Sequence, residues 1–184
     1  MIIEDGSKGY TAKVNPDGHL VTRSIILSDE HYVSSYGEGA YLVGNPQISL
    51  DGTNQCCLMV KNLNNNYILH VEALFATCQS SDGAFVSVTR NPVYVSGGSA
   101  AIPENMNFGL NKTPNVEAWY GNNMFLSNNT HGILGGYIAK GFSEFPFNGA
   151  LLLYSNDSIA MCIMGTNATY ATLGVRFYFA QHNE

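Results

Sequence analysis

The chain has 184 residues, a formal net charge of −6, and only 12% charged residues. It carries eight Lys and Arg residues in total and no basic run, which argues against nucleic-acid binding through clustered cations. No segment reaches the roughly 18 apolar residues that span a membrane, and residues 1–5 lack the regions of a signal peptide. We therefore expect one domain with an appendage, made and assembled in a cytoplasm.

The N-terminal segment reads as an arm. Tyr10, Ala12 and Val14 alternate with polar residues, residues 15–18 form a turn signal, and the chain runs back through Leu20. This pattern predicts a β-hairpin with strands at 11–14 and 19–27, followed by a polar linker over 28–39. We divide the chain into an arm and linker, 1–38, and a body, 39–184.

The body shows strand periodicity and no helical periodicity, because Gly, Asn, Ser and Thr interrupt nearly every window. Residues 173–179 alternate most clearly, so that Leu173, Val175, Phe177 and Phe179 should share one face. Residues 96–115 read as a long loop. Short strands at this spacing are typical of an antiparallel β-sandwich, and we expect a jelly-roll-like one. The predicted strands are 40–43, 55–61, 67–77, 84–90, 92–95, 117–120, 131–138, 150–155, 158–165 and 170–181.

The four cysteines are Cys56, Cys57, Cys78 and Cys162. No Cys-x-x-Cys pair is present to bind zinc, and we expect all four to be small buried hydrophobes. A bridge from Cys56 or Cys57 to Cys78 is the alternative.

No reaction centre emerges from the sequence. The histidines lack zinc-ligand spacing, and neither a nucleophile elbow nor a phosphate loop is present. We expect no catalytic residue, no metal and no cofactor. A hydrolase remains a third hypothesis, because two of four carboxylates could meet in space as in glycosidases. These are Glu72, Glu104, Glu117 and Glu144.

Two long stretches are poor in charge. Residues 118–139 hold no charged side chain, and residues 145–175 hold only Asp157. Because interface cores are depleted of charge, the two stretches together favour a homo-oligomer.

The N-terminal pattern Asp5-Gly6-x-Lys8-Gly9-Tyr10-x-Ala12-Lys13-Val14-Asn15-x-x-Gly18-x-Leu20 resembles the start of small β-rich virion structural proteins of tailed bacteriophages. Residues 38–43, 86–92 and 107–109 look similar to that family as well. The chain departs from it in its Asn-rich, cysteine-bearing body. The resemblance implies a virion protein of the capsid decoration (cement) type or a head- or tail-attached accessory component.

Our leading hypothesis is a non-enzymatic decoration protein on the capsid surface. It would trimerise and bind the major capsid protein, with the arm adding a strand or strap to a neighbour. The residues that we expect to make this contact are Gly6, Lys8, Gly9, Tyr10, Ala12, Val14, Gly18 and Leu20.

The alternative hypothesis is a receptor- or glycan-binding knob of a phage fibre or tail. Its contact surface would be the loop formed by Trp119, Tyr120, Asn122 and Asn123, since rings stack on sugars and amides bond to hydroxyls.

Overall fold

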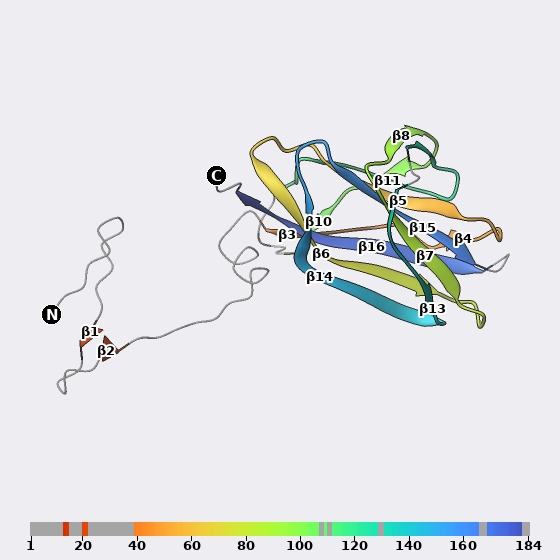
Figure 1. Ribbon diagram of the computed structural model, residues 1–184, viewed down its shortest axis with the longest axis horizontal. Helices are drawn as coiled ribbons and strands as arrows, with labels where there is room; N and C mark the ends of the chain where they lie inside the picture. The colour runs from red at the N-terminus through yellow and green to blue at the C-terminus, as the bar shows by residue number, and fades with distance from the viewer. Residues whose placement is uncertain are drawn as a thin grey trace.

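The computed structural model describes residues 13–14, 20–21, 39–106, 109, 112–128, 131–165 and 169–181. All regular structure in these residues is β, which confirms the predicted all-β class (Figure 1). The described residues contain no helix that could cross a membrane.

Two six-stranded antiparallel sheets form the body. We name each after its central strand. The β16 sheet runs in the order β10 (Glu104–Asn105), β3 (Ala40–Gly44), β16 (Tyr170–Gln181), β6 (Tyr67–Cys78) and β14 (Gly141–Leu153), with β4 (Ile48–Ser49) also paired to β16. The β15 sheet runs in the order β13 (Gly132–Ile138), β7 (Ala84–Arg90), β15 (Ser158–Gly165), β5 (Gln55–Asn62), β11 (Val116–Tyr120) and β9 (Ser99–Ala100).

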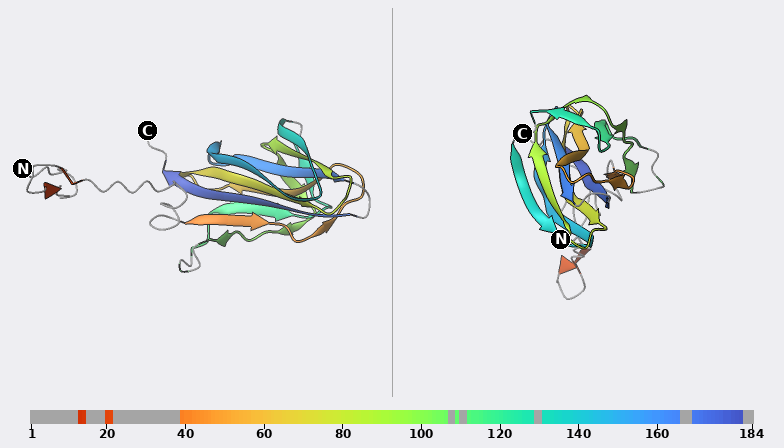
Figure 2. Two further views of the ribbon diagram at one scale, coloured as in Figure 1. Left: turned by 90° about the horizontal axis from the view of Figure 1, so that it is seen from below. Right: turned by 90° about the vertical axis from the view of Figure 1, so that its right-hand side faces the viewer.

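The two sheets stack face to face, and one hydrophobic core fills the space between them (Figure 2). The last strand, β16, supplies its alternate residues to this core, as the sequence predicted. Its core residues are Leu173, Val175, Phe177 and Phe179. Because two antiparallel sheets enclose one core, the antiparallel β-sandwich expected from the strand spacing is confirmed. Within its sheet, β16 lies between β3 and β6.

A smaller two-stranded sheet, which we call the flap, consists of β8 (Val93–Ser96) and β12 (Phe125–Ser127). A second cluster of apolar residues joins the flap to the β15 sheet. In this cluster Leu126 of the flap packs with Met59 of β5, and the ring of Tyr94 stacks on that of Trp119 with centroids 4.0 Å apart. The flap therefore covers part of the face of the β15 sheet that points away from the main core.

Most predicted strands of the body match observed strands to within a few residues, but the prediction misses the first part of β14 and the short strands β4, β9, β10 and β12. β14 begins at Gly141, whereas the prediction began at 150, and the missed part contains Pro146 and a register shift between Pro146 and Leu151. An edge strand tolerates proline because one side of its backbone needs no ladder partner. The expected loop over 96–115 contains the short strands β9 and β10.

The cysteine prediction is wrong for one pair. Cys56 and Cys162 form a disulfide across β5 and β15, where their Cα atoms are register partners. Cys57 and Cys78 are free and buried, as expected, and the alternative bridge to Cys78 is absent. The sequence could not show this because the bonded residues are 106 positions apart and only the pairing of the two strands brings them together.

Little of the predicted arm is described. β1 (Lys13–Val14) pairs antiparallel with β2 (Leu20–Val21), and Val14 is the register partner of Leu20. The remainder of residues 1–38 lies outside the described residues.

Candidate functional site

An apolar groove crosses the outer face of the β16 sheet, and we call it the β16 groove. Its volume is about 440 Å³. Leu42 of β3 and Met106, just after β10, line one side, and each is 41% exposed. Phe75 of β6 and Phe142 of β14 line the other side, and Phe142 is 65% exposed. Large apolar side chains thus remain in contact with solvent on a sheet whose opposite face supplies the main core.

Two glycines make the hollow. Gly44 of β3 and Gly174 of β16 are register partners, and both line the groove. Because neither residue has a side chain, the sheet surface between Leu42 and Phe75 is recessed relative to these two side chains. A Cβ at Gly174 would lie in ordinary contact with the Phe75 ring, at 3.6 Å, and would begin to fill this floor.

At the polar end of the groove, the positive charge of Arg176 is balanced by a carboxylate of the same chain. The Arg176 guanidinium lies 3.5 Å from the Glu144 carboxylate and 5.5 Å from the centroid of the Phe75 ring. Phe75 in turn stacks on Phe142, with ring centroids 5.7 Å apart. The groove therefore presents mainly apolar surface, and its one cation is already paired.

The sandwich has two free strand edges, and one of them, that of β14, lies beside the groove. β14 is the outermost strand of the β16 sheet and β13 is the outermost strand of the β15 sheet, and only Ala139 and Lys140 join them. Among the described residues, neither strand has a partner on its outer side. Tyr137 of β13 is 80% exposed. Exposed edges with apolar side chains are sites where further chains can pair.

The docking residues predicted in the arm cannot be placed beside this groove. Val14 and Leu20 are described only as backbone partners in β1 and β2. The other predicted docking residues lie outside the described residues, namely Gly6, Lys8, Gly9, Tyr10, Ala12 and Gly18.

The predicted recognition loop begins at the end of β11, which contains Trp119 and Tyr120, and several of its side chains make contacts within the chain. Trp119 is half-buried against Tyr94, and its Nε1 donates a hydrogen bond of 2.8 Å to Glu117. Tyr120 packs against the main core. Asn122 and Asn123 are exposed, and the side-chain oxygen of Asn123 accepts a hydrogen bond from the Gly98 N–H at 3.0 Å. The recognition role of this loop stays a prediction.

The four glutamates considered for hydrolysis lie on different strands. Glu72, Glu104 and Glu144 belong to strands of the β16 sheet, whereas Glu117 belongs to the β15 sheet. The described residues contain no cluster of three or more His, Cys, Asp or Glu side chains that could hold a metal ion.

No family model, curated protein or solved structure matches this chain.

Sequence reasoning missed the β16 groove. Its residues come from five strands or their ends, and only strand order shows that they meet on one face. One signal was available: residues 172–178 alternate large core residues with small or polar ones, so Gly174 marks a low point on the outer face.

Proposed function

We propose that the chain is a non-enzymatic virion structural protein, a capsid decoration protein that self-associates through the β16 groove and attaches to the shell through its N-terminal arm. The observation that carries the proposal is the groove itself, where Leu42, Met106 and Phe142 are exposed together. Such a patch is typical of an interaction surface. The attachment to a virion rests on the sequence resemblance described above.

We further infer that the sandwich is a jelly roll. Its eight principal strands are β3, β5, β6, β7, β13, β14, β15 and β16 in chain order. If these strands are numbered one to eight along the chain, the β16 sheet has the order 1-8-3-6 (β3, β16, β6, β14). The β15 sheet has the order 2-7-4-5 (β5, β15, β7, β13). Two intertwined Greek keys produce this arrangement, which virion proteins commonly use. The segment between β7 and β13 is then an insertion that carries the flap.

The occupant of the β16 groove is a second copy of this chain. The groove is mainly apolar, and its cation, Arg176, pairs with Glu144 within the subunit. This composition suits a permanent contact between identical chains, whose interface cores are rich in aromatic residues and methionine and poor in charge. The free edge of β14 continues the same surface, so that an extended segment of a neighbour could add to it by backbone pairing.

The Cys56–Cys162 disulfide also supports the proposal. Disulfides persist in oxidising surroundings such as the surface of a released virion, and they are rare in proteins that act in the cytosol.

Self-association is tested by a matched pair of variants. Phe142 lies in the groove and is 65% exposed, while Phe125 lies on the flap and is 62% exposed. We expect F142E to reduce the oligomer to monomers in light-scattering measurements and F125E to leave it intact, because only the first places a charge in the interface. A monomeric wild-type chain, or equal effects of both variants, would contradict the proposed interface.

Attachment is tested on particles that lack the protein. The full chain should bind them, and a truncated chain of residues 25–184 should stay folded and fail to bind. Unimpaired binding by the truncated chain would exclude the arm as the point of attachment.

A further inference from the structure

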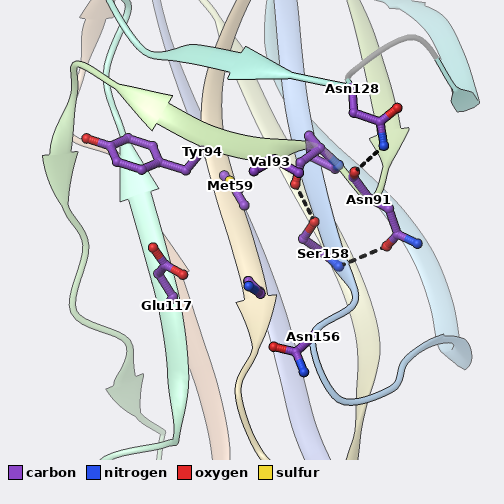
Figure 3. A pocket seen from close by; sticks show the side chains of 10 residues that line it. Met59, Asn91, Val93, Tyr94, Glu117, Asn128, Asn156 and Ser158 are labelled. Atoms are coloured by element: carbon purple, nitrogen blue, oxygen red, sulfur yellow. Dashed lines mark hydrogen bonds between the residues drawn. The ribbon is translucent and has the colours of Figure 1, made fainter.

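A second pocket lies between the flap and the β15 sheet and has a chemistry unlike that of the β16 groove. Its volume is about 330 Å³. β5, β8 and β11 form its walls together with the turns that precede β8 and β15, and Figure 3 shows Glu117 on one side and Asn91 and Asn128 on the other. This volume is within the range of small-molecule sites.

Three asparagines at its rim share an unusual backbone conformation. Asn91, Asn128 and Asn156 have φ values of 51°, 55° and 69°. In the described residues only one other non-glycine residue, Asn148, has a positive φ. Asparagine adopts this conformation more readily than other side chains do. Turns built in this way bring three amide groups to one pocket. One polar atom of each amide is engaged within the chain, namely the Asn91 oxygen and the Asn128 and Asn156 nitrogens, which leaves the Asn91 nitrogen and the Asn128 and Asn156 oxygens uncommitted.

Hydrogen bonds fix the wall that carries Asn91. The Ser158 N–H donates to the Asn91 side-chain oxygen at 3.0 Å, and the Asn91 N–H donates to the Ser158 carbonyl at 2.8 Å. The Ser158 hydroxyl donates to the Pro92 carbonyl at 2.7 Å, and the Asn128 amide donates to the Asn91 carbonyl at 3.2 Å. The wall is therefore ordered before any ligand arrives, which lowers the entropic cost of binding.

Two opposite charges lie in the pocket without pairing. Lys61 of β5 and Glu117 of β11 are register partners. Glu117 instead accepts the Trp119 indole N–H through one carboxylate oxygen, which leaves its other oxygen to accept from a ligand. The Lys61 side chain has no hydrogen-bond or ion-pair partner among the described residues. Its ammonium group therefore has three donors to offer.

Apolar groups complete the lining. Met59, Pro92, Val93 and Tyr94 border the pocket. The Tyr94 ring is held by its stack on Trp119, and its hydroxyl donates to the Gly97 carbonyl at 2.9 Å. Trp119 therefore acts as a positioning residue, because it orients both Tyr94 and Glu117.

We propose that this pocket binds a pyranose unit of a saccharide. Hydroxyl groups donate and accept, as the three amides do, and the C–H face of a pyranose can pack on the apolar lining. One cation and one carboxylate favour a ligand without net charge, which argues against a phosphate ester. A virion protein with this pocket would contact carbohydrate on a cell surface through the flap side, away from the β16 groove.

The test uses the full chain with ¹³C-labelled methionine methyl groups. Met59 lines the pocket and reports binding, while Met106 lies in the β16 groove and serves as an internal reference. The probes are the methyl glycosides of glucose, galactose and mannose, and N-acetylglucosamine, each at millimolar concentration. We expect at least one to shift the Met59 resonance saturably and to leave that of Met106 in place.

Variants then assign the contact. Asn156→Gly removes an amide from the pocket but accepts the same positive φ, and Asn148→Gly makes the same change on β14, outside the pocket. Lys61→Met removes the ammonium group at similar size. Loss of a hydrogen bond should weaken affinity about tenfold for K61M and somewhat less for N156G, with no change for N148G.

Three results would overturn the proposal. The first is that no pyranoside shifts Met59. The second is that N148G weakens binding as much as N156G does. The third is that glycine or inorganic phosphate shifts Met59 and displaces the bound pyranoside, since the pocket would then serve a zwitterion or an anion. None of these results bears on the oligomer or on attachment to particles, so the two proposals fail separately.

Discussion

Asn62→Ala should be among the most damaging single substitutions in the body. Asn62 is fully buried at the end of β5, and its amide donates to the carbonyls of Tyr67 and Leu153 at 3.0 and 2.9 Å. Its side-chain oxygen accepts the Asn64 N–H at 2.8 Å. Alanine removes all three bonds and leaves buried backbone groups without partners. At roughly 1 kcal/mol for each bond, plus the desolvation of an orphaned group, we expect a loss of about 3–4 kcal/mol.

Urea unfolding followed by circular dichroism measures this loss. With a slope of about 2 kcal/mol per molar urea, the midpoint should fall by about 1.5–2 M at unchanged slope. Asn65→Ala is the control, because Asn65 is exposed and its oxygen accepts only the Ser155 hydroxyl. It should cost less than about 0.5 kcal/mol. Equal midpoints for the two variants would refute the role given to Asn62.

Three further predictions concern the β15 sheet and the flap. Replacing Cys56 and Cys162 by serine should lower stability by about 2–5 kcal/mol in guanidinium, because the disulfide closes a separation of 106 residues; an unchanged midpoint would count against the bond. Burial, and secondarily a nearby carboxylate, raises the pKa of Cys57 to about 12 from 9.0, so its thiol should resist iodoacetamide at pH 8 until the protein unfolds. Because the folded pKa is the higher one, this contribution to stability is complete below pH 9 and is lost as the pH rises toward 12. Tyr94→Leu should shift the emission of Trp119, the one tryptophan of the chain, to longer wavelength, since its stacking partner is removed; an unchanged spectrum would mean that Trp119 does not depend on Tyr94.

Local alternation was enough to predict most strands of the body. Residues 84–90 and 158–165 form β7 and β15 with the predicted bounds, because each combines β-branched or apolar residues with a turn at its end. The prediction missed the first half of β14 for a local reason. β14 pairs with β6 along one side only, so it tolerates Pro146, and a register shift between Pro146 and Leu151 contains Gly149.

The candidate sites depend on contacts that no local pattern shows. Asn91 and Asn156 were recognisable only as turn residues, and Lys61 only as a charged residue in a strand. They line one pocket because β5 pairs with both β15 and β11, which are far apart in the chain. Leu42 and Phe142 line one groove in the same way, because β3 and β14 belong to one sheet. Strand order, and not composition, assembles both surfaces.

The most direct test of the proposed function is a cryo-EM map of the phage particle whose genome encodes this chain. Our account predicts the β-sandwich on the outside of the icosahedral shell, with the β16 groove against a second copy and residues 1–38 reaching the capsid protein. Density for the sandwich on the tail alone, or a complete particle without it, would contradict the assignment as a decoration protein.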